Sequence, residues 1–146
     1  MGAPGFGLRF IQATHYNSLG AFASVNHLHF QMFVKPDGFP VMARQWRHNG
    51  GETPYPATCL AFTDPKSAWE GIHQLHERET PYNLLYSAGC LYLFPRRKQG
   101  TYPQPPWTSG FTWHELAGSM ITFNRDDYQR LDEATIRQEL SLLDLG

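Results

Sequence analysis

Two histidines and a glutamine stand at alternating positions early in the chain. His27, His29 and Gln31 are separated by single apolar residues, and a period of two is typical of a β-strand with one polar and one apolar face. The sequence therefore predicts a strand over residues 26–34 that places the three polar side chains on one face. A neutral imidazole is a competent nucleophile at phosphorus, and a neighbouring polar group can fix its tautomer.

The histidine pair alone leaves three interpretations open. The rings could be ordinary hydrogen-bonded groups of a half-buried sheet face. They could be half of a metal site, whose missing ligands would have to come from elsewhere, with His73 and His76 as the candidates. They could also carry out nucleophilic catalysis at phosphorus.

The residues around the histidines favour catalysis. Residues 24–31 read Ser-Val-Asn-His-Leu-His-Phe-Gln, and the pattern Ser-x-x-His-x-His-x-Gln resembles the active-site motif of the transferase and phosphorylase branch of the histidine-triad, or HIT-like, superfamily. Residues 16–23, 93–95 and 113–118 add a closer resemblance to the GDP-L-galactose and GDP-D-glucose phosphorylases. The resemblance implies an α+β fold of the HIT-like type, an antiparallel β-sheet with helices packed mainly on one face.

The resemblance also implies roles for individual residues. His29 would be the nucleophile that attacks the α-phosphorus and becomes a nucleotidyl-histidine, which divides one transfer into two displacements. His27 would hold the nucleophilic ring in orientation. Ser24 would offer its hydroxyl or backbone N–H to a non-bridging phosphate oxygen, and Asn17 would lie near the same phosphate.

Gln31 bears on the type of reaction. Hydrolases of the superfamily usually have a third histidine at this position, which can pass a proton, whereas an amide can hydrogen-bond to phosphate but cannot act as a general acid or base at neutral pH. The resemblance therefore implies a nucleotidyltransferase or phosphorylase acting on a nucleoside diphosphate sugar or a dinucleoside polyphosphate. The alternatives are a nucleotide hydrolase of the same superfamily and a non-catalytic nucleotide-binding domain.

A basic run follows the last predicted hairpin. Arg96, Arg97 and Lys98 are candidates for binding the incoming phosphate or the remaining phosphates of the nucleotide, because cations next to a strand end suit that task. The same run is equally typical of a solvated hairpin end.

The remaining patterns predict short elements joined by many turns. A helix is expected over residues 66–79, with Trp69, Ile72, His73 and His76 on its inner face. A β-hairpin is expected from residues 82–86 and 91–95, and a terminal helix from residue 126 onward. Further strands are expected over residues 8–13, 39–46, 58–62 and 119–123.

Composition limits the class of protein and its partners. The 146 residues include 41% apolar residues, with 12 basic against 13 acidic side chains, which is typical of one soluble domain without the basic surface that binds nucleic acid polymers. Two separated cysteines and the lack of a long apolar run indicate a cytoplasmic protein with no disulfide, cysteine zinc site or membrane segment. Because catalysis is preferred over the metal site, we expect no metal or other cofactor. The expected partners are a nucleotide or nucleotide sugar and inorganic phosphate.

The position of the motif bears on domain organisation. We expect residues 1–146 to form a single HIT-like domain. Relatives in this branch are longer, with more chain before the histidines, so the chain resembles the catalytic half of a larger architecture. Its site would then be completed by a second copy, as a homodimer, or by a separate partner half.

Overall fold

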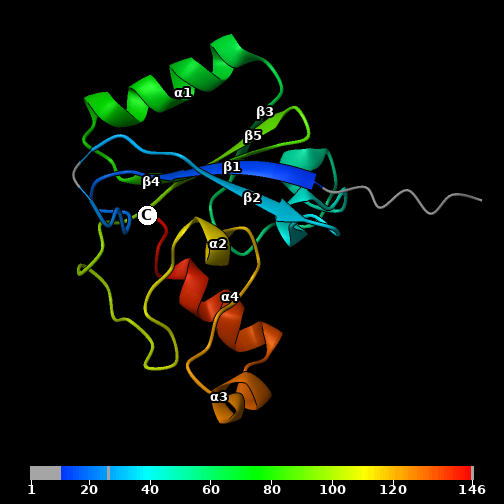
Figure 1. Cartoon of the computed structure of the whole chain (residues 1–146), viewed down its shortest axis with the longest axis vertical. Coiled ribbons are helices and arrows are strands. Elements are labelled where there is room, and N and C mark those ends of the chain that lie inside the picture. The colour runs from blue at the N-terminus through cyan, green and yellow to red at the C-terminus, as the bar shows by residue number, and fades with distance from the viewer. Residues whose placement is uncertain (1–10, 26, 146) are drawn as a thin grey trace, which may run out of the picture.

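A five-stranded antiparallel sheet forms the centre of the molecule (Figure 1). The computed structural model describes residues 11–25 and 27–145. Neighbouring strands follow the order β2-β1-β4-β5-β3. The strands are β1 (Ile11–Asn17), β2 (Gln31–Lys35), β3 (Leu60–Phe62), β4 (Tyr82–Ser87) and β5 (Cys90–Pro95).

The predicted hairpin is confirmed as β4 and β5. Ser87 pairs with Cys90 across a two-residue turn, in which Ala88 and Gly89 both have positive φ, 52° and 78°. Positive φ at both central residues gives a turn whose twist matches that of the strands. This tight connection places two long strands in the middle of the sheet.

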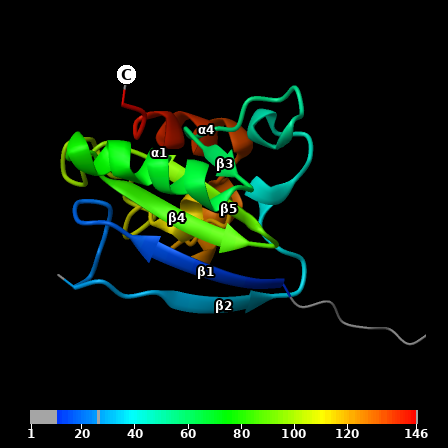
Figure 2. The ribbon, with the colours of Figure 1, turned by 90° about the horizontal axis from the view of Figure 1, so that it is seen from above.

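Helices cover both faces of the sheet, with three of the four in the described residues on the same side. Figures 1 and 2 show α1 (Pro65–Glu77) on one face and α2 (Trp113–Leu116), α3 (Arg125–Arg130) and α4 (Glu133–Ser141) on the opposite side. Each face has its own apolar cluster, and the larger lies beneath α2 and α4. The predicted α+β class, with helices mainly on one face, is confirmed.

Helix α1 agrees with the prediction in position but only in part in its inner face. Asp64 caps the helix by accepting a hydrogen bond of 2.8 Å from the Ser67 N–H. The expected inner face is right only in part: Ile72 packs against the smaller apolar cluster, but Trp69 is 64% exposed while Ala68 and Leu75 are buried. The helix approaches the sheet through small residues: a Cβ at Gly71 would lie 3.0 Å from the Phe62 ring.

Two predicted strands are absent from the described residues, and a third is displaced. Residues 39–46 contain the 3-10 helix η1 (Pro40–Met42) and a single β-bridge at Trp46, because Pro40 starts a helical turn and has no N–H for a sheet ladder. Residues 119–123 form no strand. The strand expected over residues 8–13 is β1, which extends to Asn17, while residues 8–10 lie outside the described part.

The predicted terminal helix is two helices. Leu131, with φ −72° and ψ 122°, is extended and ends α3. Asp132 then caps α4 by accepting a hydrogen bond of 2.8 Å from the Thr135 N–H. Leu140 and Leu143 pack into the larger core. In the described part of the chain, no helix has the length and apolar character needed to cross a membrane.

Candidate active site

The paired histidines precede strand β2 rather than lying on it. The ladder between β1 and β2 ends at the pair His15 and Gln31, so the predicted strand over residues 26–34 is corrected to Gln31–Lys35. Ahead of Gln31 the described chain leaves the sheet, while β1 continues to Asn17 in its ladder with β4. Asn26 lies outside the described residues.

A cavity of about 240 Å³ opens where this segment meets β1 and the start of α2. It brings together four of the residues that the sequence singled out, namely Asn17, Ser24, His29 and Gln31. The other lining residues are His15, Tyr16, Phe22, Thr112 and Trp113.

The His29 ring is oriented by the backbone of His27. His29 Nδ1 lies 3.1 Å from the His27 carbonyl oxygen, and the two ring centroids are 5.4 Å apart. A carbonyl oxygen can only accept, so the Nδ1–H donates and the neutral His29 ring carries its lone pair on Nε2. The positioning expected of His27 is therefore supplied by its main chain.

Gln31 contacts His15, a buried histidine that the sequence pattern did not single out. Gln31 Oε1 lies 2.7 Å from His15 Nε2. The His15 ring is stacked on Trp113, with centroids 3.9 Å apart and planes 20° apart. Burial lowers the pKa of His15 below its ordinary value of 6.5. Alternation along β1 places His15 on the face of Asn17, which is the signal that could have identified it.

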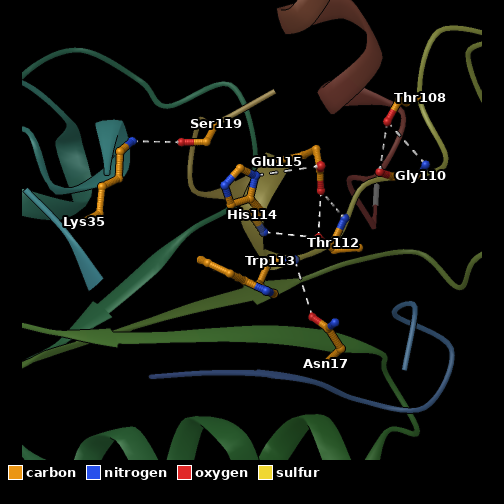
Figure 3. A network of polar contacts seen from close by, with 9 residues as sticks. All are labelled: Asn17, Lys35, Thr108, Gly110, Thr112, Trp113, His114, Glu115 and Ser119. Carbon is orange, nitrogen blue, oxygen red and sulfur yellow. Dashed lines mark hydrogen bonds and ion pairs between the residues drawn. The ribbon is translucent and has the colours of Figure 1, made fainter. Parts of the chain in front are cut away.

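Asn17 is held by two donors on its side-chain oxygen, of which Figure 3 shows the Trp113 N–H. Asn17 Oδ1 accepts hydrogen bonds from Asn83 Nδ2 at 2.6 Å and from the Trp113 N–H at 3.4 Å. Asn83 is fully buried and in turn accepts from Arg96 Nη1 at 3.3 Å. With its oxygen occupied, Asn17 has its two Nδ2 hydrogens left to donate.

The structure does not bring the basic run to this cavity. Arg96 is fully buried, and besides Asn83 its guanidinium donates to the Phe111 carbonyl and the Tyr102 hydroxyl. Arg97 donates to backbone carbonyls, and Lys98 lines a separate groove beside α1. Phosphate binding by Arg96, Arg97 and Lys98 remains a prediction without support from their positions.

The short helix α2, drawn in Figure 3, contributes Trp113 to the lining of the cavity. The Thr112 N–H and hydroxyl donate to Glu115 Oε2 at 2.9 and 2.7 Å, which closes a capping box. Glu115, for which the sequence suggested no role, is thus a buried structural carboxylate. The box holds Trp113 against His15.

Phe22 forms another wall of the cavity under local strain. Its φ is +63°, and its ring lies against Gly110, where an added Cβ would come within 2.3 Å. The Arg96 guanidinium lies 5.3 Å from the ring centroid on the other side. Phe22 and Gly110 are far apart in the sequence, so no local pattern reveals this contact.

No group of three or more His, Cys, Asp or Glu side chains that could hold a metal ion occurs among residues 11–25 and 27–145. Of the two candidate extra ligands, His73 is exposed on α1 and faces Glu77 at 3.4 Å. His76 bonds to the Tyr82 hydroxyl at 2.6 Å, on the opposite face of the sheet from His15.

The sheet order, the helix layers and the histidine segment entering an edge strand define an α+β protein of HIT-like fold. The chain is similar to solved structures of yeast Ap4A phosphorylase Apa2. The Apa2 complex with Ap4A gives a TM-score of 0.64 at 14% identity, over 93% of this chain and 55% of that one. The complex with AMP also gives 0.64, over 92% and 56%. Apa2 alone gives 0.66 at 14% identity, over 93% and 56%.

The similarity to Apa2 lies in the fold. No family model matches the sequence, and no curated protein matches it. The chain spans little more than half the length of the solved structures that it resembles.

Proposed function

We propose that this protein is a nucleotidyltransferase or phosphorylase in which His29 is the nucleophile. The observation that carries the proposal is the cavity where His29, Gln31, Asn17 and Ser24 converge, with the His29 Nδ1–H donating to a backbone carbonyl. That hydrogen bond leaves Nε2 as the nitrogen able to attack.

The proposed reaction has two displacements at one phosphorus. In the first, the Nε2 lone pair of His29 forms a P–N bond to the α-phosphorus, and the bond to the leaving phosphate oxygen breaks with its electron pair. In the second, an oxygen of inorganic phosphate attacks the same phosphorus, and the P–N electron pair returns to Nε2. The products are a nucleoside diphosphate and the released phosphorylated group.

The other cavity residues suit the charge that develops on the phosphoryl oxygens. Asn17 and Gln31 have amide N–H groups available, and Ser24 adds a hydroxyl. Donors placed in advance around such oxygens stabilise the transition state. Among the described residues that line the cavity, the side chains able to take up a proton near neutral pH are histidines. By the resemblance, Gln31 stands where hydrolases of the superfamily have their third histidine, and its amide cannot take up a proton.

We propose a nucleoside diphosphate sugar or a dinucleoside polyphosphate as the substrate. The fold supports the second class, because Apa2 is a phosphorylase solved with Ap4A and with AMP. The sequence motifs support the first, through their resemblance to the GDP-sugar phosphorylases. Both classes contain the α-phosphorus that His29 would attack.

The test is to incubate the protein with GDP-glucose, GDP-galactose or Ap4A in phosphate buffer and to analyse protein and products by mass spectrometry. The expected result is a mass increase of one nucleotide on His29 and a nucleoside diphosphate as product. A nucleoside monophosphate made with oxygen from water would identify a hydrolase. Binding without either product would identify a nucleotide-binding domain.

We also propose that the site is completed by a second copy of the chain or by a separate partner half. Within residues 11–25 and 27–145, strand β2 pairs with β1 alone, and the chain spans little more than half of its structural neighbours. Phe30, Met32 and Val34 are 60%, 70% and 51% exposed. An unpaired edge strand with apolar side chains is a surface on which another sheet can dock.

A further inference from the structure

His15 is buried directly behind Gln31. The two residues are opposite each other in the register of β1 and β2, and their side chains meet at 2.7 Å. His15 is 6% exposed and is packed face to face on Trp113. The contact joins a cavity residue to an imidazole that the proposed chemistry does not use.

The surroundings of His15 determine which ring nitrogen carries the proton. Nδ1 is buried and has no hydrogen-bond partner among the described residues. A proton on Nδ1 would be a buried donor without an acceptor, which folded proteins avoid. The proton of the neutral ring is therefore on Nε2, which donates to Gln31 Oε1. Burial also favours the neutral ring.

The tautomer of His15 in turn decides the orientation of the Gln31 amide. With Oε1 occupied by the His15 N–H, the Nε2 group of Gln31 is directed elsewhere and retains both hydrogens. Gln31 lines the cavity. We infer that His15 is a positioning residue that turns the Gln31 amide so that its N–H donors bind a phosphate oxygen in the cavity.

A second chain of hydrogen bonds beside the cavity follows the same logic. Arg96 can only donate, so it binds the oxygen of Asn83, and the Asn83 NH₂ group then donates to Asn17 Oδ1. Asn17 is left with N–H donors, as Gln31 is. Two side-chain amides that both present donors suit an anion, and the identification of that anion as a nucleotide phosphate rests on the proposed function.

The tautomer can be measured without ligand or turnover. Long-range ¹H–¹⁵N spectra of the unliganded protein at neutral pH are expected to show His15 as a neutral ring protonated on Nε2. The His15→Phe variant assigns the signals by removing them. A ring protonated on Nδ1, or on both nitrogens, would overturn the inference whatever the protein catalyses.

A double-mutant cycle tests the effect on ligand binding, with AMP as the probe. His15→Phe keeps an aromatic ring on Trp113 but removes the donor, and Gln31→Leu removes the amide. Each change is expected to weaken AMP binding about tenfold, the scale of one hydrogen bond to a charged group. Because His15 acts through Gln31, adding His15→Phe to Gln31→Leu should cause no further loss.

The control variant is His73→Phe, which changes an exposed histidine on α1 and is expected to leave AMP binding unchanged. Additive losses in the cycle, or full affinity in His15→Phe, would contradict the inference. If the unaltered protein does not bind AMP, the proposed function fails, while the spectra still decide the role of His15. Circular dichroism establishes that each variant is folded.

Discussion

The hydrogen bond from His29 Nδ1 to the His27 carbonyl selects the nitrogen that can attack phosphorus. Because the acceptor is a main-chain oxygen, it survives any change of the His27 side chain. The two histidines of the motif therefore have unequal roles. One contributes its imidazole, and the other contributes the backbone that orients it.

His29→Ala is expected to abolish nucleotide transfer, with a loss on the order of 10³-fold or more, because no other group replaces the attacking nitrogen. The measurement is the yield of nucleotidyl-protein by mass spectrometry. His27→Ala is the matched control and should retain far more activity, since its carbonyl remains. Turnover by His29→Ala would refute the assigned nucleophile.

Gln31→His is expected to raise the ratio of hydrolysis to phosphorolysis. An imidazole at this position can pass a proton to or from an attacking water molecule, and an amide cannot. The ratio of nucleoside monophosphate to nucleoside diphosphate in phosphate buffer gives the outcome. An unchanged ratio would remove the reason for preferring a phosphorylase over a hydrolase.

At the scale of elements, the cavity depends on two neighbouring segments of the chain and on a third from a distant part of the sequence. The end of β1 provides Asn17, the segment before β2 provides His29, and the capped start of α2 provides Trp113. The loop that carries Phe22 is held against Gly110. Its packing, rather than a regular element, sets the cavity wall.

Gly110→Ala is expected to displace Phe22 and to weaken AMP binding. An added Cβ would lie 2.3 Å from the Phe22 ring, and φ at Gly110 is +140°, so a loss of about 1–3 kcal/mol in the free energy of unfolding is expected. Urea denaturation and AMP titration measure the two effects.

Gly100→Ala is the control for Gly110→Ala. Gly100 also has a positive φ, +82°, but an added Cβ would meet nothing within 4 Å. This variant should lose only about 1–2 kcal/mol from backbone strain and keep its affinity for AMP. Equal effects on AMP binding at the two glycines would show that the Phe22 contact does not shape the cavity.

At the scale of the molecule, two apolar clusters lie on opposite faces of one sheet, and the candidate site opens at the sheet edge beside the larger one. Figure 2 shows β2 as the outermost strand, separated by β1 from the part of the sheet that α1 covers. The site therefore lies between the buried His15 and the exposed edge of the sheet.

Stability is expected to fall as the pH drops below 6.5. Burial lowers the pKa of His15, with smaller effects from His114 and His29, and burial also lowers the pKa of His48. The unfolded chain therefore binds these protons more tightly, so the free energy of unfolding is highest above pH 6.5 and decreases on acidification.

Urea denaturation at about pH 7.5 and at lower pH measures this dependence. His15→Phe removes the contribution of His15 and leaves that of His48, so the change in stability across the range should be smaller than in the unaltered protein. A pH dependence identical in the two proteins would contradict the assignment of a buried neutral ring.

Self-association through the β2 edge is the expected state of the chain in the absence of a separate partner half. Met32→Lys should weaken it in sedimentation experiments over a concentration series, because a charge on an edge strand opposes pairing. Trp69→Lys, which changes an equally exposed residue on α1, is the control. A chain that is monomeric at all concentrations would contradict the homodimer.

The sequence alone determined the features that depend on near neighbours. The hairpin β4–β5, the capped helix α1 and the Ser-x-x-His-x-His-x-Gln motif were all predictable, because short-range turn chemistry, capping and residue spacing specify them. The motif also identified three of the residues that line the cavity, and the resemblance in the residues before it added Asn17.

Only the tertiary structure decided where β2 begins, which side of α1 faces the sheet and what stands behind the motif. Strand β2 begins at Gln31, where its ladder with β1 ends although β1 itself continues to Asn17 beside β4. The contacts of His15 with Trp113 and of Asn83 with Asn17 join segments that are far apart in sequence. Such pairings arise from packing and from buried polar groups seeking partners, which local patterns do not encode.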